Sequence, residues 1–201
     1  MDLNVIITGV GGQGNVLASQ ILGNAAVSRG FHVSIGETFG LSQRGGAVMS
    51  HVRFFGGPRY SPLIPPNRAD IVVGLEPLES LRIAHDYANA STLFIVNSRP
   101  IYPLNVIAGD AEYPETSWIK EVLEQCSDKL YWLEGTQIAI ELGGPIMLNM
   151  VMLGALCAIE DFPIHAEDIK AVLKDIFAAD KLEANYKAIE RGQDLIKNHE
   201  N

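Results

Sequence analysis

Residues 3–14 read LNVIITGVGGQG and decide the first part of the fold. Residues 3–8 are mostly apolar and β-forming, and they end at Gly9, which predicts a buried strand. Apolar residues at helical spacing follow Gly14 and stop at Gly30, and residues 31–35 are again strand-like. Strand, glycine turn, helix and strand make one βαβ unit, so we expect the two strands to form a parallel pair.

Strands and helices continue to alternate along the chain. Residues 36–46 hold four glycines and are expected to form a loop. Further strands are predicted at 47–55, 70–75, 92–97 and 129–133, and helices from Pro77, at 117–126, at 136–142, near 146–159 and within 166–197. The pattern predicts an α/β fold in one domain, 1–201. We expect a Rossmann-like open, mostly parallel sheet flanked by helices, with a helical C-terminal third.

Composition and charge exclude several classes of protein. The 201 residues include 15 Lys and Arg against 24 Asp and Glu, whereas a nucleic-acid-binding domain needs a basic face. The only cysteines, Cys126 and Cys157, are too few for a zinc or iron–sulfur site and favour a reducing compartment. The chain starts without the basic segment of a signal peptide, and the uncharged run 142–159 contains Pro145 and Asn149. We therefore expect a cytoplasmic protein that binds no nucleic acid, membrane or metal.

The turn after the first strand matches the pattern G-x-G-x-x-G, with Gly9, Gly11, Gly12, Gln13 and Gly14. Glycines at a strand–helix turn let backbone amides approach a pyrophosphate. A dinucleotide site also needs an acidic residue at the end of the second strand, and the only candidate, Glu37, comes late. The alternative is that the glycines only allow the strand and the helix to pack closely.

The glycine-rich segment 36–46 also contains side chains suited to binding. These candidates are Glu37, Thr38, Gln43, Arg44, Gly45 and Gly46. Gln43 and the planar guanidinium of Arg44 can hold a phosphate or carboxylate, and Arg44 can equally pair with an acidic residue of a partner subunit. His51 follows on the next strand and is a candidate for proton transfer, although a lone histidine on a strand is more often structural.

Residues 149–156 read NMVMLGAL and carry no charge on any helical face. A helix that is apolar all round is buried, either in the core of its own chain or against another subunit. Asn149, Met150 and Met152 are therefore candidate interface residues, with a place in the core as the alternative.

Five segments together resemble one family. They are GVGGQG at 9–14, GETFGLSQRGGAVMSHVR at 36–53, SPLIP at 61–65, DIVVGLEPLESLR at 70–82 and NMVMLGAL at 149–156. These segments are similar to the small, gamma-type module of the 2-oxoacid:ferredoxin oxidoreductases. Within that family the resemblance is greatest to the beta subunit of indolepyruvate ferredoxin oxidoreductase. Residues 98–140 carry little of it.

The resemblance implies an enzyme complex that oxidatively decarboxylates a 2-oxoacid with coenzyme A, giving an acyl-CoA, CO2 and reduced ferredoxin. Thiamine diphosphate, Mg²⁺ and [4Fe–4S] clusters would belong to a large partner chain, since this chain lacks a G-D-G…N motif and cluster cysteines. The chain would then be a subunit that is inactive alone.

The resemblance also implies roles for the matched residues. The turn at 9–14 would face the active-site cleft or coenzyme A, residues 37–46 would contact the partner, and Arg44 would make a charged contact to substrate or coenzyme. The helix from Asn149 would pack at the subunit interface. Two alternatives stay open: a stand-alone NAD(P)- or FAD-binding Rossmann oxidoreductase, and a nucleotide-sensing or scaffold protein without catalysis.

Overall fold

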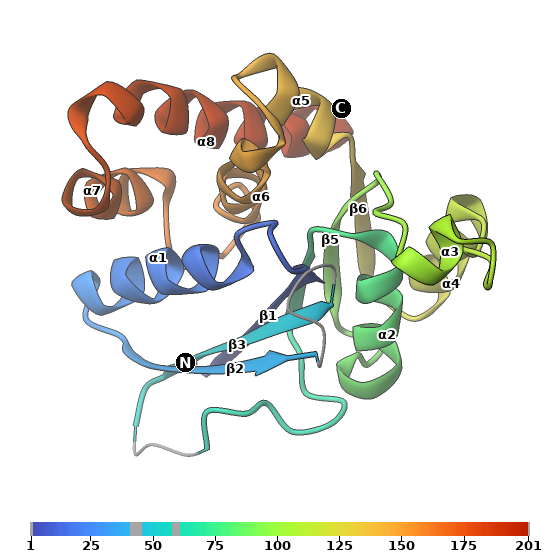
Figure 1. Ribbon diagram of the computed structural model, residues 1–201. Coiled ribbons are helices and arrows are strands. Elements are labelled where there is room, and N and C mark those ends of the chain that lie inside the picture. The colour runs from blue at the N-terminus through green and yellow to red at the C-terminus, as the bar shows by residue number, and fades with distance from the viewer. Residues whose placement is uncertain (1, 41–45, 58–60, 201) are drawn as a thin grey trace.

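The computed structural model describes residues 2–40, 46–57 and 61–200 (Figure 1). Within them, six strands form one sheet in the order β2-β3-β1-β4-β5-β6. The strands are β1 (Leu3–Val10), β2 (His32–Phe39), β3 (Ala47–Phe55), β4 (Ile71–Gly74), β5 (Leu93–Asn97) and β6 (Lys129–Leu133). The helices are α1 (Asn15–Ser28), α2 (Pro77–Tyr87), α3 (Leu104–Ile107), α4 (Thr116–Gln125), α5 (Gly135–Glu141), α6 (Leu148–Leu156), α7 (Ala166–Ile176) and α8 (Ala179–Glu200), with a 3₁₀ turn η1 (Pro145–Met147) before α6.

The predicted α/β fold with a mostly parallel sheet and a helical C-terminal third is confirmed. Strands β1, β4, β5 and β6 pair in parallel. The predicted parallel pairing of the first two strands is wrong, because β3 lies between β1 and β2 and is antiparallel to both. The predicted loop at 36–46 is also shorter than expected, since β2 continues to Phe39 before the chain returns as β3.

The alternation of side chains along the strands builds a separate core on each face of the sheet. In β1, Val5 and Ile7 join the core beneath α1, α6, α7 and α8, whereas Ile6 joins the core beneath α2 and α4. In β3, Val52 and Phe54 face the α1 side, as their spacing predicts. Figure 1 shows these two helical layers on either side of the sheet.

Helix α6 is the centre of the larger core. All nine of its residues are buried, and it lies between α1 and α8. Glycines allow this close approach: a Cβ on Gly154 would lie 2.1 Å from the Ile189 carbonyl oxygen, and one on Gly192 would lie 1.9 Å from that of Val151. The two helical backbones therefore touch where they cross.

Candidate functional site

The glycine turn joins the carboxyl end of β1 to the start of α1. Gly12 has φ +102° and Gly14 has φ +83°, backbone angles that favour glycine over every other residue. Gly9 has a different reason, because a Cβ there would lie 2.5 Å from the Gln13 side-chain oxygen. Gly12 and Gly14 are thus favoured by left-handed backbone conformations, and Gly9 is favoured because the Gln13 side chain packs against it.

Gln13 holds this turn in place. Its Oε1 accepts a hydrogen bond from the Val10 amide over 2.8 Å, and its Nε2 donates one to the Leu75 carbonyl over 2.7 Å. Leu75 directly follows β4, so the side chain fastens the turn to the neighbouring strand. Both polar ends bond within the chain, so Gln13 positions the turn.

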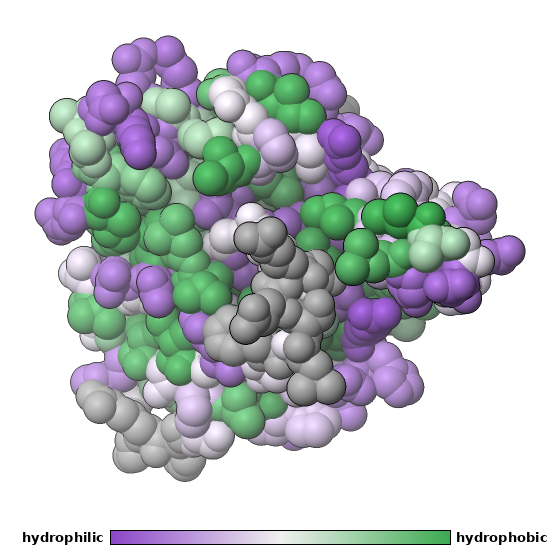
Figure 2. Space-filling model, viewed as in Figure 1, coloured by the Kyte–Doolittle hydropathy of each residue, from purple (hydrophilic) through white to green (hydrophobic). Residues whose placement is uncertain are grey.

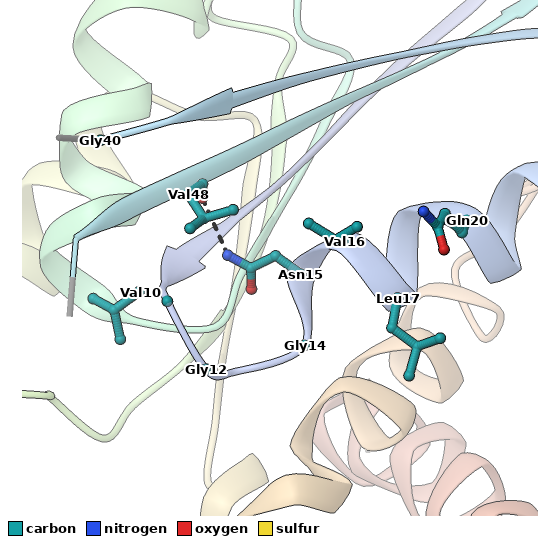
Figure 3. Close-up of a pocket in the computed structure, with 10 residues that line it drawn as sticks. Val10, Gly12, Gly14, Asn15, Val16, Leu17, Gln20, Gly40 and Val48 are labelled. Carbon is teal, nitrogen blue, oxygen red and sulfur yellow. Dashed lines mark hydrogen bonds between the residues drawn. The ribbon is translucent and has the colours of Figure 1, made fainter. Parts of the chain in front are cut away.

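A hollow of about 640 Å³ opens beside the turn and the first turn of α1 (Figure 3). Its lining residues are Val10, Gly11, Gly12, Gly14, Asn15, Val16, Leu17, Gln20, Gly40 and Val48. No described side chain caps the amino end of α1, which leaves its first amides directed outward. Amides at a helix start carry partial positive charge, so this end of the hollow suits an anionic group.

Asn15 is the most unusual side chain in this hollow. It is 3% exposed, and its Nδ2 donates a hydrogen bond to the Val48 carbonyl over 3.1 Å. Its Oδ1 is buried and has no hydrogen-bond partner among the described residues. Figure 3 shows this oxygen turned away from Val48, toward the glycine turn. A buried, unpaired acceptor is costly, which marks the place as one suited to a donor from water or a ligand.

A second hollow of about 560 Å³ meets the first at Gly11 and Gly12. It is lined by Gly11, Gly12, Gln13, Arg99, Pro100, Ile101, Thr136, Ile140, Pro145 and Leu148. Arg99 comes just after β5, is exposed, and makes no ion pair within the described part of the chain. The buried Asn97 side chain accepts hydrogen bonds from the Thr136 amide and hydroxyl, which holds the start of α5 against the end of β5.

Both hollows lie at the carboxyl edge of the parallel strands. Helix α1 leaves β1 toward one face of the sheet, and α2 leaves β4 toward the other. Open α/β sheets bind ligands at such a change of direction, because the diverging helices leave a crevice there. The glycine turn at 9–14 is the wall that the two hollows share, as its position after the first strand predicts.

The predicted residues of segment 36–46 separate into three groups. Glu37 lies in β2, where its Oε1 accepts a hydrogen bond from the Ser19 hydroxyl over 3.3 Å, and Thr38 is exposed. Gly46 is tied to the glycine turn, since its carbonyl accepts a hydrogen bond from the Gly11 amide over 2.9 Å. Gln43, Arg44 and Gly45 lie outside the described residues.

His51 lines neither hollow. It is fully buried beneath α2, where its Nδ1 accepts a hydrogen bond from the Ile64 amide over 3.2 Å and its ring meets Tyr87 edge-on. Burial and the nearby Arg53 charge lower the pKa of His51 below its ordinary value. The histidine is therefore neutral near pH 7. Its hydrogen bond to Ile64 holds the 61–65 segment, as expected if His51 has a structural role and not a role in proton transfer.

The interface expectation for the helix at 149–156 needs correction. Met150 and Met152 are 1% and 0% exposed within this single chain, because α6 is packed among other helices of the same core. Asn149 is also buried, and its Nδ2 donates a long hydrogen bond to the Gly14 carbonyl. The absence of charge on this helix reflects its place in the core of the chain.

Sequence reasoning missed Asn15, Arg99 and Thr136. Arg99 and Thr136 lie in 98–140, where the resemblance to the family is weakest. The position of Arg99 could still have been predicted from the sequence. A cation directly after an apolar strand of a parallel sheet lies at the carboxyl edge.

The residues do not fit an iron–sulfur cluster. Such clusters bind through four cysteine thiolates, and the chain has two cysteines. Cys157 is buried, which raises the pKa of its thiol to about 12, and Cys126 is exposed. Among residues 2–40, 46–57 and 61–200, no group of His, Cys, Asp and Glu is arranged to hold a metal ion. None of the helices in these ranges is long and apolar enough to cross a membrane.

The fold matches solved structures of ferredoxin oxidoreductases. The chain superposes on the gamma subunit of a keto/oxoacid ferredoxin oxidoreductase from Geobacter sulfurreducens with TM-score 0.73 and 20% identity, covering 98% of each chain. It also matches a 2-oxoglutarate:ferredoxin oxidoreductase from Magnetococcus marinus, solved with 2-oxoglutarate, coenzyme A and succinyl-CoA, with TM-score 0.75 and 26% identity. That match covers 98% of this chain and 31% of the longer one.

The sequence then identifies the family. Residues 4–195 match the pyruvate ferredoxin/flavodoxin oxidoreductase family, and the chain belongs to it. Indolepyruvate oxidoreductase subunit IorB of Pyrococcus horikoshii is 38% identical over 197 residues, covering 98% of this chain and 96% of the relative. The chain is thus a small subunit of the 2-oxoacid:ferredoxin oxidoreductase type, as its motifs predict.

Proposed function

We propose that the chain serves an oxidoreductase complex that converts indolepyruvate, or a related aryl pyruvate, and coenzyme A into an acyl-CoA and CO2. The bond to the carboxylate breaks, a thioester forms, and one proton and two electrons are released, the electrons passing to ferredoxin. The 38% identity to an IorB subunit over nearly the whole of both chains carries this proposal. Thiamine diphosphate and Mg²⁺ on a large partner chain would supply the decarboxylation, and [4Fe–4S] clusters there would carry the electrons.

The role of this chain is to complete the cleft at the carboxyl edge of its sheet. The free amides at the start of α1 and the guanidinium of Arg99 favour the anionic groups of coenzyme A or the 2-oxoacid. Arg44 and Gln43 remain candidates for a contact with the partner or its ligand. On this proposal the catalytic groups belong to the partner, so the chain is inactive alone and works in the cytoplasm beside its partner.

The dinucleotide-binding alternative has less support. Glu37, the candidate ribose ligand, is in β2, two positions from β1 in the sheet, and is engaged by Ser19 on α1. Glu37 therefore does not lie at the end of a strand that neighbours β1, where such a site needs its ribose ligand.

An anaerobic reconstitution tests the proposal. The purified chain is mixed with a candidate large subunit from the same organism, and reduction of a viologen dye is followed with indolepyruvate and coenzyme A. We expect turnover only in the mixture, with each protein alone and each substrate omitted as controls. Turnover by the large subunit alone, or a mixture that forms no complex, would refute the proposal.

The substrate is tested in the same assay by replacing indolepyruvate with phenylpyruvate, pyruvate and 2-oxoglutarate. A higher kcat/KM for the aryl pyruvates supports the assignment. A preference for pyruvate or 2-oxoglutarate would keep the complex and reject the aryl substrate.

A further inference from the structure

The segment 99–115 forms an arm that projects from the carboxyl edge and carries the short helix α3. Figure 2 shows apolar side chains gathered along this projection, at the place of α3 in Figure 1. Leu104 is 80% exposed and Ile107 is 69% exposed, and no residue of α3 is buried. Ile101 and Tyr102 are exposed beside them. A cluster of four exposed apolar residues on one projection is typical of an interaction surface.

The arm is held rigidly although it buries little. Glu76, at the start of α2, is 1% exposed, and its Oε1 accepts hydrogen bonds from the Tyr113 hydroxyl and, over 3.2 Å, from the Ile101 amide. The Tyr113 hydroxyl also accepts a hydrogen bond from the Leu78 amide, and its ring packs edge-on against Tyr102. One buried carboxylate thus fastens both ends of the arm.

This rigidity is meaningful for binding. A buried carboxylate must be fully hydrogen-bonded to be tolerated, and here its partners belong to the arm and to α2. A surface that is ordered in advance loses less conformational entropy when a partner covers it. The anchored arm therefore favours a stable protein partner over a loose or occasional contact.

The charges around the arm indicate the chemistry of that partner. Asp110, Glu112 and Glu115 are exposed on it, and the only Lys, Arg or His in 99–115 is Arg99, at the base of the arm. The chain as a whole carries a net charge of −9. Acidic side chains on the same segment as an apolar cluster repel nucleic acid, anionic lipid and a second copy of the same surface. Such a segment is complementary to an apolar hollow edged by lysine or arginine.

We propose that the arm is the main anchor for the large subunit, inserting Leu104 and Ile107 into an apolar hollow with a basic rim. The inference rests on the proposed function for the identity of the partner. Ile101 also lines the second hollow, so docking at the arm would place the partner chain over the proposed ligand cleft.

Binding of the chain to the separately purified large subunit, measured anaerobically by biolayer interferometry, tests the arm. The variant Leu104→Asp/Ile107→Asp changes only exposed side chains, so its melting temperature is expected to match that of the wild type. Its Kd should rise by about 30-fold or more, since central apolar anchors carry much of the affinity of an interface. Val27→Asp, on the exposed side of α1, is the matched control and should leave Kd within about 2-fold.

The rim is tested with Asp110→Lys/Glu112→Lys. Association should slow by about 3- to 10-fold at low salt, and the difference should shrink at high salt as screening increases. Faster association by this variant would contradict the inference that the partner's hollow has a basic rim.

The outcomes separate the two proposals. If the Leu104→Asp/Ile107→Asp variant binds as tightly as the wild type, the arm is not the main anchor for the large subunit. The proposed function would be unaffected by that result. A wild type that does not bind the large subunit would overturn both. A wild type that forms dimers which the variant abolishes would show that a second copy, not the large subunit, covers the arm.

Discussion

Asn149 in α6 and Gly14 at the start of α1 are 135 residues apart in the chain, yet the Asn149 Nδ2 donates a hydrogen bond to the Gly14 carbonyl over 3.4 Å. The contact is so close that a Cβ on Gly14 would lie 2.5 Å from the same nitrogen. The glycine motif at the cleft is therefore shaped partly by the buried C-terminal helix, and not by local sequence alone.

The Gly14–Asn149 contact predicts a measurable coupling. Gly14→Ala should destabilise the fold by about 1–3 kcal/mol through its left-handed φ and the collision with Asn149. Gly12→Ala is the matched control, because Gly12 also has a positive φ but has open space around a Cβ. In urea unfolding, Asn149→Ala should recover part of the loss in Gly14→Ala and none of that in Gly12→Ala. Additive losses in both pairs would contradict the coupling.

At the crossing of α6 and α8, the sign of the stability change in a glycine-to-alanine variant tests how closely the two helices pack. Helix propensity alone would make Gly192→Ala stabilising by about 1 kcal/mol. The collision with the Val151 carbonyl should reverse this and destabilise by about 3 kcal/mol, because backbone cannot move aside without separating the helices. Chemical denaturation measures the difference, with Gly57→Ala, at an open position, as the control. A stabilised Gly192→Ala would show that the crossing is looser than described.

The buried His51 predicts a dependence of stability on pH. Its pKa is lowered in the folded chain, so below its ordinary value of 6.5 the unfolded chain binds a proton that the folded chain does not. Stability from His51 should therefore fall as the pH drops below 6.5, by up to about 1.4 kcal/mol per pH unit. His51→Asn keeps an acceptor for Ile64 without titrating, and comparing the two proteins from pH 7.5 to 5.5 isolates the effect. Parallel stability curves would contradict it.

Arg99 predicts a kinetic effect in the reconstituted complex. If its guanidinium contacts an anionic group of substrate or coenzyme, Arg99→Ala should raise the KM of that compound by about 10- to 100-fold, with a smaller change in kcat. Arg68→Ala removes an exposed arginine from another part of the surface and should leave both constants unchanged. A normal KM for coenzyme A and for the 2-oxoacid in Arg99→Ala would exclude the contact.

The local sequence pattern predicted the strands and helices better than it predicted how the strands pair in the sheet. Residues 47–55 and 129–133 form strands over the predicted bounds, because their side chains alternate or stay apolar for the whole strand. The position of β3 between β1 and β2 was not predictable, since it depends on contacts between distant segments that no local pattern records. Helix α3 was missed for a related reason: it buries nothing, and the segment that carries it is held at Ile101 and Tyr113 by Glu76 from another element.

The site was predictable in part. The glycine turn lies where its motif places it, at the carboxyl end of β1. The use of Gln13 inside the turn could not be foreseen, because it depends on the Leu75 carbonyl brought alongside by β4. The uncharged sequence at 149–156 is compatible with core and interface alike, because its burial depends on distant elements that pack around α6.

The late position of α6 and α8 in the chain affects how the protein is made. Val5 and Ile7 of β1 and the inner face of α1 are synthesised before residues 148–200, which form the helices that complete their core. Until those helices are made, part of this apolar surface stays uncovered, a state in which nascent chains are prone to aggregate. The larger core can therefore close only after residues 148–200 have been synthesised.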